Sequence, residues 1–447
     1  MWKILRSNAR AVTRSHYVQK LNRTFLSEAY RCTDAWNKRL ESPILSKINP
    51  DEFFIELDKK FQSSGRASAV DVDIYSNIVT NIDHVEGLLN ILTKLRLTSE
   101  ASNILDSTHH AVIRYLFDNN NIDDLLTVLN DRINYGIFPD YLCYNILMDT
   151  FIKRQDYASA ARVAVLLMLQ EDSSNPISNA LALYSCLKYL ENPESWKAPE
   201  PEPEEDPKGE EIKVRVQFIR NPFFDDHFDL TDPQDLVGKT LVFYGKASND
   251  VVSRSCHLRG LVLWKKYKDA SNLIKQWTDN NQNECIYEEV LAQVQQHLSH
   301  IPEDKITDEV KELNELLNKL DRSNLAKGSV LEEIEKRVRE AVKTHEETDI
   351  SETYKIYDDW EKTRISLLQA QIDELDKKSR LEKVDEMKKE LQLRERFLTF
   401  FENKKTIELQ IEQKIIMENR KYGPKLRVAE DIDDNYIPPV IKKERRN

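Results

Sequence analysis

Glycine, cysteine and long apolar runs are all scarce in this chain of 447 residues. It contains only nine glycines and five cysteines. Few glycines leave few positions for the tight turns of β-hairpins, and the many Leu, Lys, Glu, Ile and Asn residues favour helices. No apolar run approaches the roughly 18 to 20 residues that a membrane-spanning helix needs. The sequence therefore predicts an all-α protein without a membrane span.

The cysteines form neither a CxxC pair nor a zinc-finger spacing. They are Cys32, Cys143, Cys186, Cys256 and Cys285. Cys143 and Cys186 lie in apolar helical contexts and are expected to be small buried residues. Cys256 precedes His257, but neighbours on a helix point about 100° apart and make a poor pair of metal ligands. We predict no disulfide, no metal and no cofactor.

Acidic residues are absent from the first 27 positions. The basic residues there are Lys3, Arg6, Arg10, Arg14, Lys20 and Arg23. Basic side chains scattered among Ser, Thr and apolar residues are typical of a mitochondrial presequence. A basic arm that binds nucleic acid is the alternative. We expect import, with cleavage between Asn22 and Tyr30.

Without that segment the chain is strongly acidic. The whole chain has 65 basic and 77 acidic residues, so removal of the six basic residues leaves 59 against 77, a net charge near −18. A protein that binds RNA by neutralising phosphates needs a basic surface. We therefore expect RNA contact only from small basic patches or from shape, and protein partners to matter more.

A period of 35 residues runs through the middle of the sequence. Gly136 tolerates a left-handed turn, Pro139 cannot continue a helix, and Asp140 suits the N-cap of the next one. The segments 71–105, 106–140 and 141–175 are expected to be three helical hairpins, and Pro176 starts a further helix. The aligned pairs are Asp106 with Tyr141, His110 with Asn145, Val112 with Leu147, Leu116 with Phe151 and Leu125 with Ala160.

The C-terminal part of the sequence predicts a long helix. Residues 351 to 422 contain neither Gly nor Pro. Apolar residues follow coiled-coil spacing, slip in phase and resume, so a coiled coil and a single solvated helix are equal alternatives. The residues are Ile365, Leu368, Ile372 and Leu375, then Val384, Met387 and Leu391.

Composition and pattern together predict eight segments along the chain. They are a presequence (1–27), a helical N-terminal segment (28–68), helical repeats (69–190), an acidic Pro-rich linker (191–233), further helical hairpins (234–300), a charged helical connector (301–350), a long helix or coiled coil (351–422) and a flexible tail with a basic end (423–447).

The hairpins resemble the pentatricopeptide repeat, whose stacked copies form a solenoid that commonly binds single-stranded RNA. A closer resemblance is to the pentatricopeptide-repeat proteins of the mitochondrial small ribosomal subunit. It rests on YGIFPDYLCYNILMDTFIKRQDYASA, LSEAYRCTDAWNKRLESP, LVGKTL, WKKYKDA, an acidic disordered insertion and a charged helical tail. The resemblance implies a non-enzymatic ribosomal component in the mitochondrial matrix, with small-subunit ribosomal RNA and other ribosomal proteins as partners. Messenger or transfer RNA is a further partner to consider.

The repeat family also implies candidate RNA-reading positions. Its fifth and last residues face the bases, and here they are Asn145 with Asn175, and His110 with Asp140. His110 departs from the usual small or amide residue at this position. The alternative is that Asn145 and His110 are ordinary polar residues of a helix face.

Basic residues offer a second route to RNA, through phosphates rather than bases. Lys153 and Arg154 end one predicted helix. The terminal residues Lys442, Lys443, Arg445 and Arg446 form a basic tail, for which plain solubility is an equal alternative.

Two other functional readings remain open. One is a free mitochondrial pentatricopeptide-type factor for transcript stability or translation, and the other is a coiled-coil assembly adaptor without RNA contact. An enzyme is not expected, since no nucleophile stands near a base at readable spacing. Gly238, Lys239 and Thr240 copy the end of a phosphate-binding loop, but Pro233 occupies the position of its first glycine.

Overall fold

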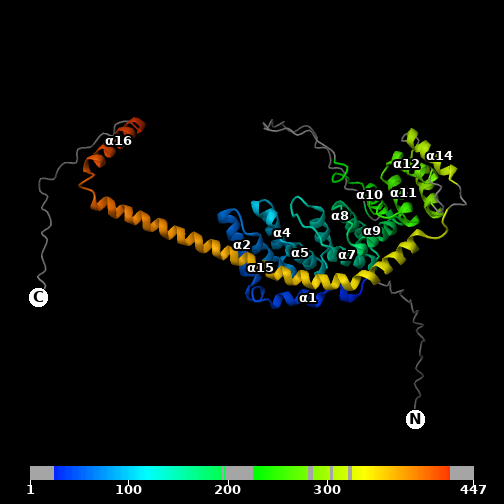
Figure 1. The fold of residues 1–447 in the computed structure, drawn as a ribbon, viewed down its shortest axis with the longest axis horizontal. Helices are drawn as coiled ribbons and strands as arrows, with labels where there is room; N and C mark the ends of the chain where they lie inside the picture. Colours follow the sequence, from blue (N-terminus) through cyan, green and yellow to red (C-terminus); the bar gives the residue numbers. More distant parts are fainter. Residues whose placement is uncertain are drawn as a thin grey trace, which may run out of the picture. The chain divides into compact units, whose positions relative to one another are not determined.

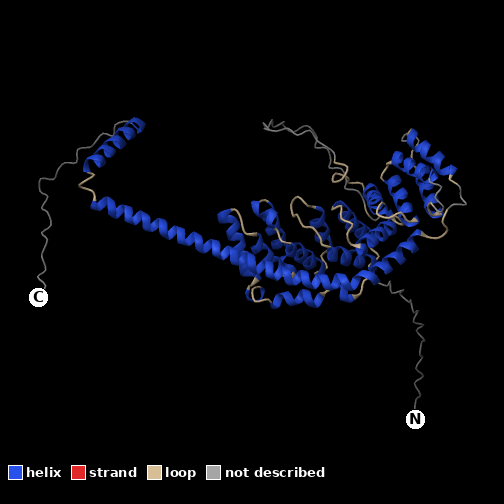
Figure 2. Ribbon diagram, viewed as in Figure 1, coloured by secondary structure: helices blue, strands red, loops and turns tan. Residues whose placement is uncertain are grey.

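The computed structural model describes residues 25–193, 196, 225–279, 285–302, 306–320 and 325–422. Helices account for nearly all of their regular structure, and no sheet forms among them (Figure 2). The prediction of an all-α fold is confirmed. None of these helices is both long and apolar enough to cross a membrane.

The chain divides into two compact units, Met1–Leu367 and Leu368–Asn447. Most of the predicted presequence, most of the acidic linker and the whole tail from residue 423 lie outside the described residues.

Short helices open the first unit. The sequence predicted a helical segment from residue 28, and the structure breaks it because Cys32 takes a left-handed backbone with φ of 46° and Pro43 has no N–H to donate. Asn49 caps the following longer helix by accepting a hydrogen bond from the backbone N–H of Asp51 at 3.1 Å. The elements are η1 (Glu28–Arg31), α1 (Thr33–Lys38), η2 (Arg39–Glu41), η3 (Leu45–Lys47) and α2 (Pro50–Ser64).

Stacked helix pairs follow as a solenoid (Figure 1). α5, α7 and α9 begin at Asp106, Tyr141 and Pro176, which are 35 residues apart, as the sequence period predicted. Side chains at Asp140, Asp156 and Asn175 cap the helices that follow them. The elements are α3 (Ala69–Ile78), η4 (Ile82–His84), α4 (Val85–Arg96), η5 (Ser99–Asn103), α5 (Asp106–Asp118), α6 (Ile122–Asn130), α7 (Tyr141–Lys153), α8 (Tyr157–Leu169) and α9 (Pro176–Tyr189).

The centre of this stack is α7. Every residue from Leu142 to Ile152 is buried. A helix that is buried on all sides must be covered by neighbours on all sides. α8 and α9 cover one part of α7, and η1, whose Tyr30 bonds to Asn145, covers another.

The second set of hairpins is packed through glycine. α10 (Pro233–Gly245) and α11 (Val251–Leu263) approach so closely that a Cβ placed on Gly260 would lie 2.5 Å from the carbonyl oxygen of Gly238. The Gly-Lys-Thr sequence therefore lies inside a packed helix and forms no phosphate-binding loop. Three further helices complete this region: α12 (Tyr267–Asp279), α13 (Glu288–Ser299) and α14 (Asp308–Lys319).

α15 (Val330–Leu398) is longer than predicted at its start. The sequence predicts the long helix from Ser351, but the helix begins directly after the turn at Gly328. Val330, Ile334, Val338 and Val342 are buried at a spacing of four residues, which gives this part of α15 an apolar face against the solenoid.

The second unit consists of the remainder of α15 and of α16 (Lys404–Tyr422). The turn at Thr399–Asn403 interrupts the predicted continuous helix. Large apolar side chains are exposed along both helices, among them Leu375 at 66%, Met387 at 61% and Met417 at 69%. The described residues of this unit thus bury almost nothing within it.

Candidate nucleic-acid interface

In each hairpin of the solenoid, the first helix (α3, α5, α7 or α9) or the residue that caps it carries polar side chains. Together these side chains form a line that connects each repeat to the next. We call this line the polar ladder. Its members are Asp73, Ser107, Thr108, His110, Asp140, Asn145, Asn175 and Ser178. The predicted base-reading residues are all part of it.

Asp73 is the first rung of the polar ladder and is fully buried. One carboxylate oxygen accepts hydrogen bonds from Thr108 at 2.9 Å, from Asn77 at 3.1 Å and from the hydroxyl of Ser107. The other accepts one from the guanidinium of Arg364 on α15 at 2.7 Å. A buried carboxylate needs a cation and several donors, and this one has both.

His110 forms the middle rung. Its Nδ1 lies 2.8 Å from Oδ2 of Asp140, and its Nε2 lies 3.0 Å from the hydroxyl of Tyr357 on α15. Its ring packs against Trp36 and Trp360, with centroids 4.7 and 5.2 Å away. Burial alone would raise the pKa of Asp140, but His110 and the hydrogen bonds to the carboxylate lower it to about 2.

Asn145 forms the last rung with the N-terminal segment. Its amide donates to the hydroxyl of Tyr30 at 2.7 Å, and its oxygen accepts from Ser178 at 2.7 Å. The Tyr30 hydroxyl donates in turn to Asp349 on α15 at 2.9 Å, and Asn175 donates to the same carboxylate oxygen at 3.0 Å. Burial raises the pKa of Tyr30, which keeps this hydroxyl protonated as a donor.

α15 contacts several hairpins of the solenoid in turn. Asp349, Tyr357 and Arg364 are eight and seven residues apart, which corresponds to roughly 12 and 10 Å along a helix. Packed helices lie about 8–10 Å apart. α15 crosses the stack and makes contacts beside α9, then beside α5 two hairpins away, then beside α3 one hairpin further (Figure 1).

The structure brings together both predicted base-reading pairs, but it buries the first member of each pair. His110 bonds directly to Asp140, and the hydroxyl of Ser178 bonds to both Asn145 and Asn175. Asn145 is 0% and His110 1% exposed, and their polar atoms are already satisfied by the chain itself. A base could reach them only if α15 and the segment around Tyr30 moved away.

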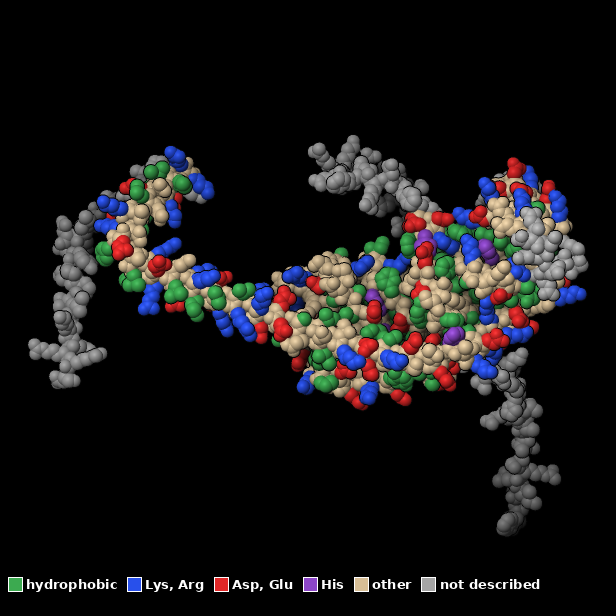
Figure 3. Space-filling model, in the orientation of Figure 1, with side chains coloured by type: hydrophobic (Ala, Val, Ile, Leu, Met, Phe, Trp, Pro, Cys, Tyr) green, Lys and Arg blue, Asp and Glu red, His purple; other side chains and the backbone are tan. Residues whose placement is uncertain are grey.

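The predicted basic contacts are placed differently. Lys153 and Arg154 are exposed at the C-terminal end of α7, where the Lys153 ammonium lies 4.0 Å from the carboxylate of Glu28. Lys442, Lys443, Arg445 and Arg446 lie outside the described residues. On the face seen in Figure 3, acidic and basic side chains of the described residues are intermixed and form no continuous basic area.

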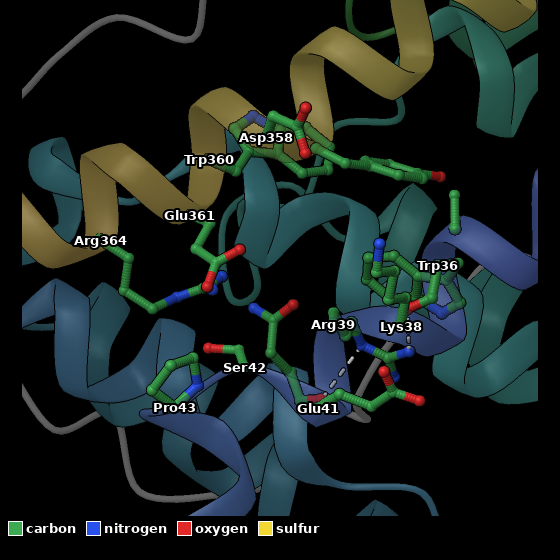
Figure 4. Close-up of a pocket in the computed structure, with 13 residues that line it drawn as sticks. Trp36, Lys38, Arg39, Glu41, Ser42, Pro43, Asp358, Trp360, Glu361 and Arg364 are labelled. Atoms are coloured by element: carbon green, nitrogen blue, oxygen red, sulfur yellow. Dashed lines mark hydrogen bonds between the residues drawn. The ribbon is translucent and has the colours of Figure 1, made fainter.

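A pocket of about 330 Å³ lies beside the polar ladder, between the N-terminal segment and α15 (Figure 4). Arg39 lines this pocket. Its guanidinium lies 3.8 Å from the centroid of the Trp36 ring and donates hydrogen bonds to the backbone carbonyls of Trp36 and Asn77. Burial lowers the pKa of Arg39 to about 10. The pocket is lined by three basic residues, Lys38, Arg39 and Arg364, and by three acidic ones, Glu41, Asp358 and Glu361, so its charges balance and give no net attraction for a phosphate.

Three side chains of metal-binding type lie near one another. The donor atoms of His110, Asp140 and Cys143 are within 4.8 Å of one another. A metal would need a thiolate and a free lone pair on the imidazole. Burial raises the pKa of Cys143, and Nδ1 of His110 already bonds to Asp140. These residues fit a hydrogen-bonded network better than a metal centre.

Sequence reasoning missed the residues that close this face. They are Tyr30, Asp73, Asp349, Tyr357 and Arg364. One available signal was the concentration of Tyr354, Tyr357 and Trp360 within an otherwise charged helix, since aromatic side chains rarely gather on a fully solvated face.

Comparison with known families identifies a match over most of the chain. The family described as mitochondrial 28S ribosomal protein S27 matches this chain over residues 1–390.

Proposed function

The chain belongs to the family of mitochondrial 28S ribosomal protein S27, and from this premise we propose that it is a scaffold that contacts ribosomal RNA without reading its sequence. Family membership makes it a component of the mitochondrial small ribosomal subunit, located in the matrix. Within the subunit, we propose that the chain contacts RNA, that its repeats are of the pentatricopeptide type, and that it is divided into the predicted segments.

The observation that carries the proposal is the closure of the polar ladder. A sequence-reading solenoid keeps its base-facing residues open to single-stranded RNA. Here α15 and Tyr30 occupy those residues with hydrogen bonds of 2.7 to 3.0 Å. The solenoid is therefore best suited to present its outer surfaces to fixed neighbours.

RNA contact is assigned to exposed basic residues. Lys153 and Arg154 are accessible on the solenoid, and the predicted tail adds four basic residues within its last six positions. Such residues bind phosphates without distinguishing bases. The repeat type is supported by the 35-residue interval between Asp106, Tyr141 and Pro176.

Co-sedimentation of mitochondrial lysate tests the scaffold role. The chain should migrate with the small subunit in intact lysate and be released, at least in part, after nuclease digestion of the ribosomal RNA. Migration as a free or light species in intact lysate would refute the ribosomal scaffold. Undiminished retention in the same protein complex after complete RNA digestion would refute an RNA-dependent attachment.

The basic tail can be tested by its salt dependence. Replacement of Lys442, Lys443, Arg445 and Arg446 by alanine should lower the salt concentration at which the chain leaves the subunit, because fewer counterions are displaced on binding. A charge-conserving control exchanges each Lys for Arg and each Arg for Lys. Equal salt tolerance of the alanine and control variants would show that the tail is no phosphate contact.

The exposed apolar side chains of the second unit support an additional role, in which its helix binds neighbouring proteins. Its exposed Ile372, Leu375, Met387 and Leu391 follow the spacing that predicted a coiled coil. Replacement of Leu375 and Leu391 by serine should weaken association with neighbouring proteins after RNA digestion. Unchanged association would remove this role.

A further inference from the structure

Asp149 on α7 carries a buried carboxylate directed at the first described residues. It is 5% exposed, and its Oδ1 accepts hydrogen bonds from the backbone nitrogens of Phe25 at 2.8 Å and Leu26 at 3.4 Å. No basic side chain of the described residues lies within ion-pair distance of it. Arg31 and Lys153 both approach Glu28 instead, at 3.8 and 4.0 Å.

This carboxylate forms no close ion pair. Burial raises the pKa of Asp149, and the two backbone hydrogen bonds, together with the more distant charges of Arg31 and Lys153, only partly offset that effect. A buried carboxylate without a cation is costly, and folded chains normally supply one. At Asp73, by comparison, Arg364 supplies it.

The residues that face Asp149 are firmly held in the fold. The ring of Phe25 packs edge-on against Tyr184 at 5.0 Å, and the guanidinium of Arg339 lies 5.5 Å from its centroid. Leu26 is buried, and the backbone nitrogen of Ser27 donates to Glu346 at 2.9 Å. Residues 25–27 thus pack with the body, although the predicted presequence extended through residue 27.

We propose that proteolytic maturation cuts the bond between Thr24 and Phe25, and that the new α-ammonium group of Phe25 binds the buried carboxylate of Asp149. The proposal rests on import by a cleaved presequence and goes beyond the ribosomal role. In the cut, a peptidase adds water to the Thr24 carbonyl and breaks the C–N bond. Thr24 leaves with a carboxylate, and the Phe25 nitrogen becomes a protonated amine.

The geometry selects this bond over its neighbours. The nitrogen that becomes charged is the one already 2.8 Å from Asp149, and a charge-assisted hydrogen bond is about twice as strong as a neutral one. A cut after Phe25 would remove the ring that packs on Tyr184. A cut before Thr24 would place the ammonium one residue, about 3.8 Å, further along the chain. Arg23, the last basic residue of the acid-free segment, lies just before the chosen bond.

N-terminal sequencing of the chain from purified mitochondrial small subunits tests the cleavage position directly. The sequence should begin at Phe25, as FLSEAYR. A start at Leu26 or later, or at any residue before Phe25, would overturn the proposal. A different N-terminal residue would not contradict the ribosomal role, because that role is tested separately by sedimentation.

Thermal unfolding tests the pairing with Asp149. Asp149→Asn in the chain that begins at Phe25 should lower the midpoint by about 2 °C or more, while the same change in the chain that begins at Met1 should not. Asp34→Asn, which removes one exposed carboxylate, is the matched control. Equal effects in the two chains would overturn the pairing.

Acetylation of the Phe25 amine provides a second measurement that needs no substitution. The acetylated chain that begins at Phe25 should melt at a lower temperature than the free-amine form, because the charge on the nitrogen is lost. Identical midpoints would show that the ammonium does not bind the carboxylate.

Discussion

At the scale of single residues, buried charge determines which contacts matter. Asp73 and Arg364 form an ion pair at 2.7 Å with side chains 0% and 5% exposed. Exposed ion pairs, such as Lys311 with Asp308, contribute little because water and salt screen them. The buried pair matters more for stability, because removal of one partner leaves the other as an unpaired charge shielded from water.

Arg364→Ala should therefore destabilise the chain by about 3–5 kcal/mol, because the carboxylate of Asp73 keeps its burial and loses its cation. Arg380→Ala, at an exposed position of the same helix, is the control and should cost less than about 0.5 kcal/mol. Equilibrium denaturation in urea measures both. Similar midpoints for the two variants would contradict the assignment.

The lowered pKa of Asp140 predicts a pH-dependent contribution. Its folded-state pKa of about 2 lies below the unfolded value near 3.9, so the stabilisation is present above about pH 4 and is lost as pH falls through 2. Asp140→Asn keeps an N-cap of similar quality and removes only the charge. At pH 7 it should cost about 1 kcal/mol, reduced from the full shift because the side chain is 39% exposed.

Denaturation of this variant and the parent at pH 7 and at pH 2.5 checks that expectation. The difference between them should shrink at the lower pH. Asp123→Asn, at an exposed position of α6, should show no such change. A constant difference between pH 7 and pH 2.5 would mean that Asp140 acts only as a cap.

At the scale of elements, the chain shows what a local pattern can and cannot predict. The starts of α5, α7 and α9 follow from the sequence period, and the cap at Asp140 follows from residue type. The early start of α15 had a signal in Val330, Ile334 and Val338, whose four-residue spacing was hidden by charged neighbours. No sequence signal predicts where α15 packs on the solenoid, because Tyr357 and His110 are 247 residues apart and their contact depends on packing of the whole unit.

The crossing of α10 and α11 gives a prediction at this scale. Gly260→Ala should cost about 1–3 kcal/mol, because the added methyl group meets the backbone of Gly238 at 2.5 Å and the helices must separate. Gly87→Ala in α4 is the matched control, since its closest neighbour is a side-chain atom of Phe54 at 3.1 Å that can rotate. Thermal unfolding of both variants should show a clear loss only for Gly260→Ala, and equal midpoints would contradict it.

At the scale of the whole molecule, the two units should differ in stability. α15 is buried at four-residue intervals from Val330 to Val342 and again at Thr353 and Arg364, whereas its described side chains after residue 372 are exposed. An isolated helix has little stability without packing. Hydrogen exchange of the free protein should therefore show strong protection at residues 334–364 and weak protection at 373–396. Uniform protection along α15 would contradict the division.

Solenoids ordinarily fold by adding one repeat to the next, since each repeat contacts only its neighbours. α15 changes that order, because Asp73 in the first repeat receives its cation from a residue 291 positions later. If the chain enters the matrix from its N-terminus, its repeats can assemble before Arg364 is available to pair with Asp73. The ion pair would form only after most of the chain has been imported, so a stable solenoid would require import to be complete.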